Sequence, residues 1–322
     1  MGGDLISMQP FGPYTLHEPL GEGGFSRVYR AHDQRRRVDV ALKLLDPAAT
    51  ATEEGRQRFL REVEAARRLR SRHIVPVYET GIHDNRAFLA LRLMRGGTLA
   101  QRLARTPILD DPAAAQVLRH VARALDHARR YGIIHRDVKP SNIFYDANGV
   151  VCLGDFGLAK VRGLVTVTKL GQIIGSVYYM APEQVRGLIY TSERSDVYSL
   201  GVVLYEMMTG RVPFQGQSQA NVLHAIVHSP PPRPRQINSR ITPEVERVIL
   251  RALHKDPQRR YASAGELAAA FQQAAFPGQA PPRRIATQPR RGEGPTTAQR
   301  PEFWVAVLGL LGLLLLILFL AS

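Results

Sequence analysis

One short stretch carries most of the residues that could do chemistry: His135-Arg136-Asp137-Val138-Lys139-Pro140-Ser141-Asn142. It offers a carboxylate, an ammonium group and an amide, and Asp155 adds a second carboxylate thirteen residues after Asn142. A carboxylate can orient a hydroxyl group and accept its proton, while a lysine can neutralise charge on a phosphoryl group in transit. Amide and carboxylate oxygens are suitable ligands for Mg²⁺. The stretch therefore predicts phosphoryl transfer, with Asp137 as base, Lys139 as cation, and Asn142 and Asp155 as metal ligands.

Together with other motifs, these residues resemble the signature set of the protein kinase family. The run Leu20–Val28 is similar to the family's glycine-rich loop, with Ser26 in place of its third glycine, and Val40-Ala41-Leu42-Lys43 is similar to the strand that carries its lysine. Met180-Ala181-Pro182-Glu183 resembles its A-P-E segment. A dinucleotide-binding fold would need a helix after the glycines, whereas the residues there favour a strand. The resemblance covers roughly residues 13–272.

The stretches that must position these residues predict two lobes. Strands are expected on both sides of the glycine turn, at 38–45, at 74–79 and at 87–93, with a turn at 83–85 before the last of them. Apolar residues on one face predict a helix over 53–70. The resemblance implies the α+β, two-lobed protein-kinase fold: a β-rich N-terminal lobe with one helix and a mainly helical C-terminal lobe.

The resemblance also implies which residues bind the nucleotide. Lys43 would grip the α- and β-phosphates and pair with Glu62 in the helix, for which Glu64 is the rival partner. Leu91 would be the gatekeeper behind the adenine, and Arg92 stands where many relatives carry an acid, so it would alter the charge near the ribose. The residues expected to bind the nucleotide are Leu20, Gly21, Gly23, Val28, Ala41, Lys43, Glu62, Leu91, Arg92, Met94 and Phe144.

In the C-terminal lobe, the two acids Asp110 and Asp111 before Pro112 predict the start of a long helix. By the resemblance, Asp196 begins a buried helix and braces the catalytic loop. The same resemblance pairs Arg260 with Glu183 as a structural ion pair.

Regulation and specificity are also implied by the resemblance. Arg136 would receive a phosphorylated residue of the activation loop, and Thr166 and Thr168 are the two candidates for autophosphorylation. Lys139, two residues after Asp137, is the arrangement of Ser/Thr kinases rather than tyrosine kinases. The expected cofactors are ATP and Mg²⁺, with Mn²⁺ as an alternative metal, and the expected partners are proteins with Ser or Thr.

One alternative from another class is a pseudokinase, a membrane-tethered scaffold that transfers nothing. Ser26 and Arg92 are the irregularities in its favour. The presence of Lys43, Asp137 and the two metal ligands argues against it.

The net charge and the cysteine count limit the classes of partner and the cellular compartment that we expect. The net charge of the 322-residue chain is +15, which suits acidic partners or an anionic membrane surface. No nucleic-acid motif accompanies that charge, so nucleic acid is not an expected partner. Cys152 is the single cysteine, which excludes a disulfide framework and fits a reducing compartment.

The C-terminal residues predict a membrane anchor. Residues 277–302 are rich in Pro and Arg and have few bulky apolar side chains, as in a disordered juxtamembrane linker. Residues 303–320 contain no charge and are mostly Leu, which predicts one transmembrane helix contacting the lipid bilayer. The arginines before it place the kinase domain in the cytoplasm of a single-pass cell-membrane protein.

The predicted division of the chain follows from these segments. It comprises a flexible leader (1–12), the N-terminal lobe (13–94), the C-terminal lobe (95–276), the linker (277–302) and the transmembrane helix (303–320). Relatives often pair through the N-terminal lobe, so a homodimer is a candidate assembly.

Overall fold

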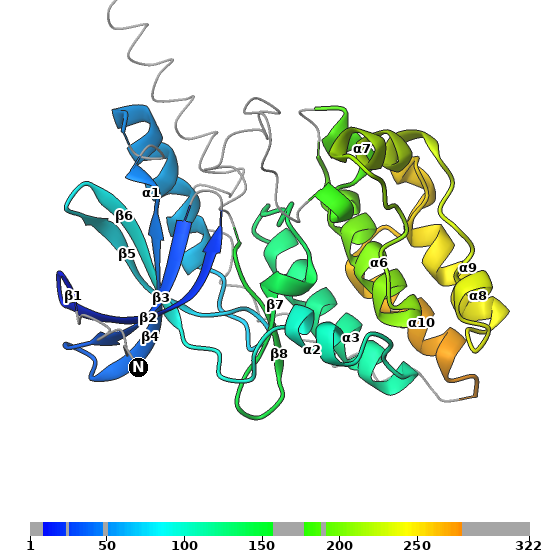
Figure 1. Cartoon of the computed structure of the whole chain (residues 1–322), viewed down its shortest axis with the longest axis horizontal. Coiled ribbons are helices and arrows are strands. Elements are labelled where there is room, and N and C mark those ends of the chain that lie inside the picture. Colours follow the sequence, from blue (N-terminus) through cyan, green and yellow to red (C-terminus); the bar gives the residue numbers. More distant parts are fainter. Residues whose placement is uncertain (1–8, 24–25, 48–50, 157–176, 188–190, 279–322) are drawn as a thin grey trace, which may run out of the picture. The chain divides into compact units, whose positions relative to one another are not determined.

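The computed structural model describes residues 9–23, 26–47, 51–156, 177–187 and 191–278. Two bodies of secondary structure make up this part of the chain (Figure 1): an antiparallel sheet with one helix, and a mainly helical body that contains a small β-hairpin. This arrangement confirms the two-lobed fold that the motifs predicted.

The N-terminal lobe is a six-stranded sheet in the order β1-β2-β3-β4-β6-β5. Its described strands are β1 (Gln9–Phe11), β2 (Tyr14–Gly23), β3 (Ser26–Asp33), β4 (Val38–Leu45), β5 (Val77–His83) and β6 (Arg86–Arg92). Asp84 and Asn85 make the β5–β6 turn with φ angles of 46° and 58°, a left-handed backbone that Asp and Asn tolerate better than most residues. The turn lies where the sequence predicted it.

Each face of the sheet carries its own apolar cluster because strand side chains alternate between faces. Val40, Leu42 and Leu44 pack with Tyr14 and Phe88 on one face. On the other face, the helix α1 (Glu53–Arg67) packs through buried apolar residues. That second cluster consists of Leu45, Phe59, Val63, Ala87 and Leu89.

Two predicted boundaries in this lobe were wrong by about one turn or less. The helix predicted to reach residue 70 ends at Arg67, and the strand predicted from residue 74 begins at Val77. Ile74 and Val75 pair with the other lobe instead: the backbone N–H of Val75 donates to the carbonyl oxygen of Leu153 at 3.0 Å, and Ile74 forms a bridge with the same residue. Tertiary pairing thus replaced the first part of the strand.

The C-terminal lobe is built around α6 (Glu193–Thr209), which is buried on nearly all sides and contacts α3, α9 and α10. Its other described helices are α2 (Leu99–Arg105), α3 (Asp111–Arg129), α5 (Pro182–Val185), α7 (Gln219–His228), α8 (Pro234–Ile237), α9 (Pro243–Ala252) and α10 (Ala264–Ala275). The side chain of Asp110 caps α3 by accepting from the N–H of Ala113 at 2.9 Å, as the predicted start signal requires. The fixed ends of these helices hold the loops between them.

A short β-hairpin directly follows the loop 135–142 and contacts the segment that joins the two lobes. Its strands, β7 (Ile143–Tyr145) and β8 (Val151–Leu153), are antiparallel. Gly96 donates to the carbonyl of Tyr145, and this contact requires glycine because a Cβ there would lie 2.6 Å from the carbonyl oxygen of Asp146. The segment that joins the lobes is therefore fastened directly to the hairpin.

The predicted transmembrane segment, 303–320, lies outside the described residues. Within the described ranges, none of the helices combines the length and the apolar character needed to cross a bilayer.

Candidate active site

The loop before the hairpin brings three predicted residues together. The Nζ atom of Lys139 lies 2.9 Å from Oδ2 of Asp137. The side-chain amide of Asn142 donates to the backbone carbonyl of Asp137 at 2.7 Å and to its Oδ2 at 3.2 Å. Asn142 stands in the short 3₁₀ turn η2 (Pro140–Asn142), which fixes its direction. Carboxylate, cation and amide therefore form one hydrogen-bonded group.

A second charged pair joins the lobes at this site. Lys43 projects from the middle of β4 and is only 4% exposed, and its Nζ atom lies 2.7 Å from Oδ2 of Asp155. Asp155 follows β8 in the other lobe, 112 residues away in sequence. The strand lysine and the second carboxylate are thus in contact, whereas the partner that the resemblance implied for Lys43 was Glu62.

The hairpin places the two groups next to each other. Asn142 precedes β7 and Asp155 follows β8, and the two strands pair Ile143 with Leu153. The carbonyl of Asn142 accepts from the N–H of Gly154 at 2.9 Å, which closes the end of the hairpin. All four residues predicted to act on the phosphoryl group therefore lie around one end of this hairpin.

Two site residues have a left-handed backbone that is unusual for side-chain-bearing residues. The φ angles are 66° at Arg136 and 64° at Asp155, a conformation that costs about 1–2 kcal/mol for such a residue. The carbonyl of Arg136 accepts from the side chain of Gln184 at 2.9 Å. Such strain persists only where surrounding contacts hold it.

Asp196 supplies the strongest of those contacts. Its carboxylate accepts from the backbone N–H groups of His135 at 2.8 Å and of Arg136 at 2.7 Å. Asp196 is 3% exposed, and this burial raises its pKa, while the two donated hydrogen bonds act in the opposite direction. The carboxylate at the start of α6 therefore sets the backbone of the catalytic loop.

His135 joins the loop to the hairpin and is not placed as a base. Its Nε2 lies 2.7 Å from the carbonyl of Gly154, and its Nδ1 accepts from the N–H of Asp137 at 3.2 Å. The ring also meets Phe156 edge-on, with centroids 4.6 Å apart. Because both ring nitrogens contact the backbone, His135 is a positioning residue.

A buried ion pair fixes the short helix α5, whose Gln184 contacts the loop at Arg136. Arg260 donates to both carboxylate oxygens of Glu183, at 2.7 and 2.8 Å, and these residues are 2% and 5% exposed. Ser195 donates to the same carboxylate at 2.7 Å. Burial acts to raise the pKa of Glu183, but the bonds from Arg260 and Ser195 outweigh it and leave that pKa lowered.

The residues expected around the adenine lie on the sheet face that carries Lys43. Cross-strand partners share a face, and β4 and β6 pair Ala41 with Leu91 and Lys43 with Leu89. The ring of Phe144 packs so closely over Gly154 that a Cβ there would lie 2.7 Å from it. Of the strand before the glycine turn, Leu20 is exposed, and Val28 of the next strand pairs with Lys43.

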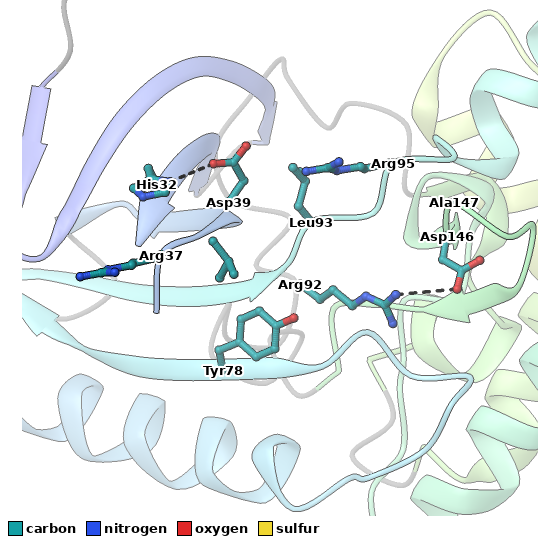
Figure 2. A pocket seen from close by; sticks show the side chains of 10 residues that line it. His32, Arg37, Asp39, Tyr78, Arg92, Leu93, Arg95, Asp146 and Ala147 are labelled. Atoms are coloured by element: carbon teal, nitrogen blue, oxygen red, sulfur yellow. Dashed lines mark hydrogen bonds and ion pairs between the residues drawn. The ribbon is translucent and has the colours of Figure 1, made fainter. Parts of the chain in front are cut away.

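The side chain of Arg92 is directed differently from the other residues expected to bind the nucleotide. Arg92 pairs with Val40, so its side chain lies on the sheet face opposite Lys43 and Leu91. It points toward Asp146, with Nη2 3.9 Å from the carboxylate, and it lines a separate pocket (Figure 2). The alternation of the strand therefore places the side chains of Arg92 and Leu91 on opposite faces of the sheet.

Several predicted residues lie outside the described part. They are the side chain of Glu62 and the activation-loop residues Thr166 and Thr168. Sequence reasoning in turn missed Gln184 and Ser195, whose roles depend on contacts across the fold. No local pattern marks either residue, because a Gln after A-P-E and a Ser in a helix are ordinary polar residues.

Comparison with known proteins agrees with this geometry. The model of the family described as protein kinase domain matches residues 14–273. The serine/threonine-protein kinase PknE of Mycobacterium tuberculosis is 39% identical over 260 residues, which are 81% of this chain and 46% of PknE. The serine/threonine-protein kinase PrkC of Bacillus subtilis is 34% identical over 265 residues, covering 82% of this chain and 41% of PrkC.

Solved structures show the same likeness. The kinase domain of PknI from Mycobacterium tuberculosis is 29% identical, with a TM-score of 0.68 over 84% of this chain and 99% of that one. This chain spans a little under half the length of the curated relatives PknE and PrkC. The matched family model, the two-lobed fold and the grouped site residues give one conclusion: the chain belongs to the protein kinase domain family.

Proposed function

We propose that this protein is a Ser/Thr protein kinase that transfers the γ-phosphoryl group of ATP to Ser and Thr hydroxyls of proteins. The observation that carries the proposal is the meeting of Lys43 with Asp155 beside the Asp137–Lys139–Asn142 group. A phosphoryl transfer site acts by positioning and by charge neutralisation, and these are the groups it requires.

Each residue has a separate task in this proposal. Asp137 orients the acceptor hydroxyl and accepts its proton as the oxygen attacks the γ-phosphorus. Lys139, 2.9 Å from Asp137, places its positive charge where the travelling phosphoryl group gains negative charge. Lys43 holds the α- and β-phosphates and is itself oriented by Asp155. The bond from phosphorus to the β–γ bridging oxygen breaks, and ADP carries that charge away.

The residues also fit a divalent metal, which the family implies. Asn142 uses its amide nitrogen to contact Asp137, so its carbonyl oxygen is the atom suited to a cation, and Asp155 supplies a carboxylate. In the described part of the chain, three or more His, Cys, Asp or Glu side chains do not gather into a metal cluster. Mg²⁺ is commonly held by one or two protein oxygens with substrate phosphates, and Mn²⁺ has similar preferences. When bound, the metal would neutralise phosphate charge.

Ser/Thr specificity rests on two observations. Lys139 stands two residues after Asp137 and reaches it, as in the Ser/Thr arrangement. The relatives PknE and PrkC both carry the name serine/threonine-protein kinase. The pseudokinase alternative is not favoured, because Lys43, Asp137, Asn142 and Asp155 are all present: Lys43 contacts Asp155, and Asp137 contacts both Asn142 and Lys139.

Activation by phosphorylation is a further part of the proposal. Arg136 directly precedes the base, and within the described residues its buried Nε atom has no hydrogen-bond partner. A guanidinium with unused donors suits a phosphate group. Thr166 and Thr168 are the two candidates to carry that phosphate by autophosphorylation.

Membrane attachment completes the proposal. The charge-free run 303–320 would span the bilayer, the arginines of 277–302 would keep the kinase domain on the cytoplasmic side, and the protein would act in membrane-associated signalling. A homodimer is the candidate assembly. Cell fractionation tests this directly: we expect the full chain with the membranes and a chain ending at residue 302 in the soluble fraction.

The kinase activity can be tested with radiolabelled ATP and a peptide library that presents Ser, Thr or Tyr as acceptor. We expect label on Ser and Thr peptides, no label on Tyr peptides, and phosphosites at Thr166 or Thr168 by mass spectrometry. Lys43→Met should remove the label and leave the thermal unfolding transition in place. If wild-type protein binds ATP but transfers no label to any peptide, the scaffold alternative is favoured instead.

A further inference from the structure

A pocket lies beside the segment that joins the lobes, outside the active site. We call it the hinge pocket, and its volume is about 470 Å³ (Figure 2). Its walls come from the β3–β4 turn, β5, the joining segment and the turn between β7 and β8. The lining residues are His32, Arg37, Val38, Asp39, Tyr78, Arg92, Leu93, Arg95, Asp146 and Ala147. Apart from Arg92, none of the predicted nucleotide residues lines it.

The cations of the hinge pocket outnumber its available acids. Arg37 lies in the β3–β4 turn, Arg92 at the end of β6 and Arg95 in the joining segment, and all three are exposed. Within the described part of the chain, Arg37 and Arg95 have no ion-pair partner, and Arg92 has only the 3.9 Å contact with Asp146. Three guanidinium groups that lack close partners around one hollow attract an anion.

Both acids in the pocket are committed to other groups. Asp39 contacts Arg30 at 3.0 Å and His32 at 3.1 Å. Asp146 uses Oδ1 to accept from the N–H groups of Asn148 and Val150, at 2.9 and 2.8 Å, which closes the β7–β8 turn. These acids therefore shape the walls and leave most of the arginine charge for a ligand.

We propose that the hinge pocket binds a phosphorylated Ser or Thr side chain. Arginine forks match the oxygens of a phosphate. Arg92 and Arg95 are the two expected to bind it, because Figure 2 shows Arg37 directed toward the far side of the pocket. The pocket is far larger than a bare phosphate and lies in the range that holds an amino-acid-sized ligand. Tyr78 lines it, and the apolar side chain of Val38 is 43% exposed at its edge, so the residues flanking a phosphorylated side chain have surfaces to contact.

The choice of this ligand rests on the proposed function, because such side chains are the product of a Ser/Thr kinase. The enzyme would thus hold a phosphorylated protein at a second place while its active site works. Arg92 and its β4 partner Val40 lie on the sheet face opposite Lys43, so a phosphopeptide held by Arg92 leaves the expected nucleotide face of the sheet free.

The test is a calorimetric titration of the full chain with the peptide Ala-Val-pThr-Val-Ala, without ATP. Matched titrants are the same peptide without phosphate, the peptide with Glu in place of pThr, and inorganic phosphate. We expect binding of the phosphopeptide, no measurable binding of the unphosphorylated peptide, and affinity for inorganic phosphate at least tenfold weaker. Saturating Mg²⁺ and a non-hydrolysable ATP analogue should leave phosphopeptide binding in place.

Substitutions locate the site. Arg92→Gln and Arg95→Gln should each weaken phosphopeptide binding about tenfold or more, the size expected for a lost charge-assisted hydrogen bond. Asp146→Asn should tighten it severalfold, because an Asn Oδ1 keeps both turn contacts while the competing charge at Arg92 disappears. Arg240→Gln is the matched control, an exposed arginine in the α8–α9 loop, and should change nothing.

Any of the following results would overturn the proposal. One is equal binding of the phosphorylated and unphosphorylated peptides, and another is equal binding of phosphopeptide and inorganic phosphate. A further one is displacement by the ATP analogue, which would place the peptide in the active site. The last is unchanged affinity in Arg92→Gln and Arg95→Gln variants whose thermal unfolding matches wild type. Because no phosphate is transferred in this experiment, its failure leaves the proposed kinase activity untouched.

Discussion

Two sets of charged residues in the C-terminal lobe differ in how they are surrounded. Behind the catalytic loop, Glu183 receives Arg260 and Ser195, and Asp196 receives two backbone N–H groups, with both acids buried. In the site itself, the side chains of Asp137 and Asp155 are 16% and 19% exposed and face lysines. The acids of the first set are enclosed by hydrogen-bond donors from the backbone, Ser195 and Arg260. The acids of the second set contact the ammonium groups of flexible lysine side chains.

This difference in burial separates the charges that stabilise the fold from those proposed to act in phosphoryl transfer. A buried charge loses a great deal when its partner is removed, since water cannot replace that partner. A partly exposed charge can be resolvated, so its loss affects activity more than folding. We therefore expect substitutions behind the loop to lower the free energy of unfolding, and isosteric substitutions in the site to lower the rate of transfer.

The largest loss of stability is expected for Arg260→Leu. It leaves the Glu183 carboxylate buried with Ser195 alone, which should lower the free energy of unfolding by about 3–5 kcal/mol. Urea unfolding followed by circular dichroism measures the change. The double variant Glu183→Leu/Arg260→Leu should recover part of the loss, because no unpaired charge remains. A double variant less stable than Arg260→Leu alone would contradict this reading.

A smaller loss is expected for Asp196→Asn. An amide keeps one acceptor oxygen but turns an NH₂ group toward the other backbone donor, so one of the two bonds at 2.7–2.8 Å is lost. The cost should be about 1–3 kcal/mol of unfolding free energy. Transfer should also slow, since the same bonds hold the left-handed Arg136. Unchanged activity in this variant would show that Asp196 does not set the loop.

Two stacked histidines between the lobes give a pH-dependent test. His73 and His120 lie with ring centroids 4.3 Å apart, and burial, with the nearby His73 and Arg119, lowers the pKa of His120 to about 4. In the unfolded chain His120 takes up a proton near pH 6.5, and in the folded chain only near pH 4. The stability that neutral His120 contributes is therefore complete above pH 6.5 and is lost as the pH falls toward 4.

The measurement is the free energy of unfolding at pH 7 and pH 4.5 for wild type and His120→Asn. An Asn oxygen can still accept from the N–H of Val151, which now donates to His120 at 3.4 Å. Wild type should lose about 1–2 kcal/mol more than the variant over this interval. Equal losses in both proteins would mean that His120 takes up its proton at an ordinary pH in the folded state.

The smallest effect is expected for Arg247→Ala, which serves as the surface counterpart of Arg260. Arg247 lies 2.8 Å from Glu244, but both side chains are more than half exposed. Such pairs contribute little, so the free energy of unfolding should change by about 0.5 kcal/mol or less. If Arg247→Ala lowered the free energy of unfolding as much as Arg260→Leu, burial would not explain why the two sets of charged residues differ.

Motif order predicted the lobes and the grouping of Lys43, Asp137, Asn142 and Asp155, because each motif has a fixed spacing from the next. Helix starts were also predictable where capping residues such as Asp110 are local signals. The start of β5 was not predictable, since Ile74 and Val75 pair with Leu153 of β8, a contact set by the packing of the lobes.

Side-chain direction was the other weakness of sequence reasoning. Arg92 was assigned to the nucleotide from its place after the gatekeeper, but strand alternation turns it to the opposite face. The hinge pocket was equally hidden, since its walls come from the N-terminal sheet and from the β7–β8 turn, which lie together only in the folded chain.

The most direct test of the central claim compares Asp137→Asn with Asp84→Asn. The first removes the proposed base, and the second makes the same chemical change in the exposed β5–β6 turn, where Asn also tolerates the left-handed backbone. Phosphoryl transfer from radiolabelled ATP and thermal unfolding are measured on both. We predict that Asp137→Asn loses at least about 10²-fold in rate and unfolds like wild type, while Asp84→Asn keeps full activity. Full transfer activity in a folded Asp137→Asn enzyme would contradict the account.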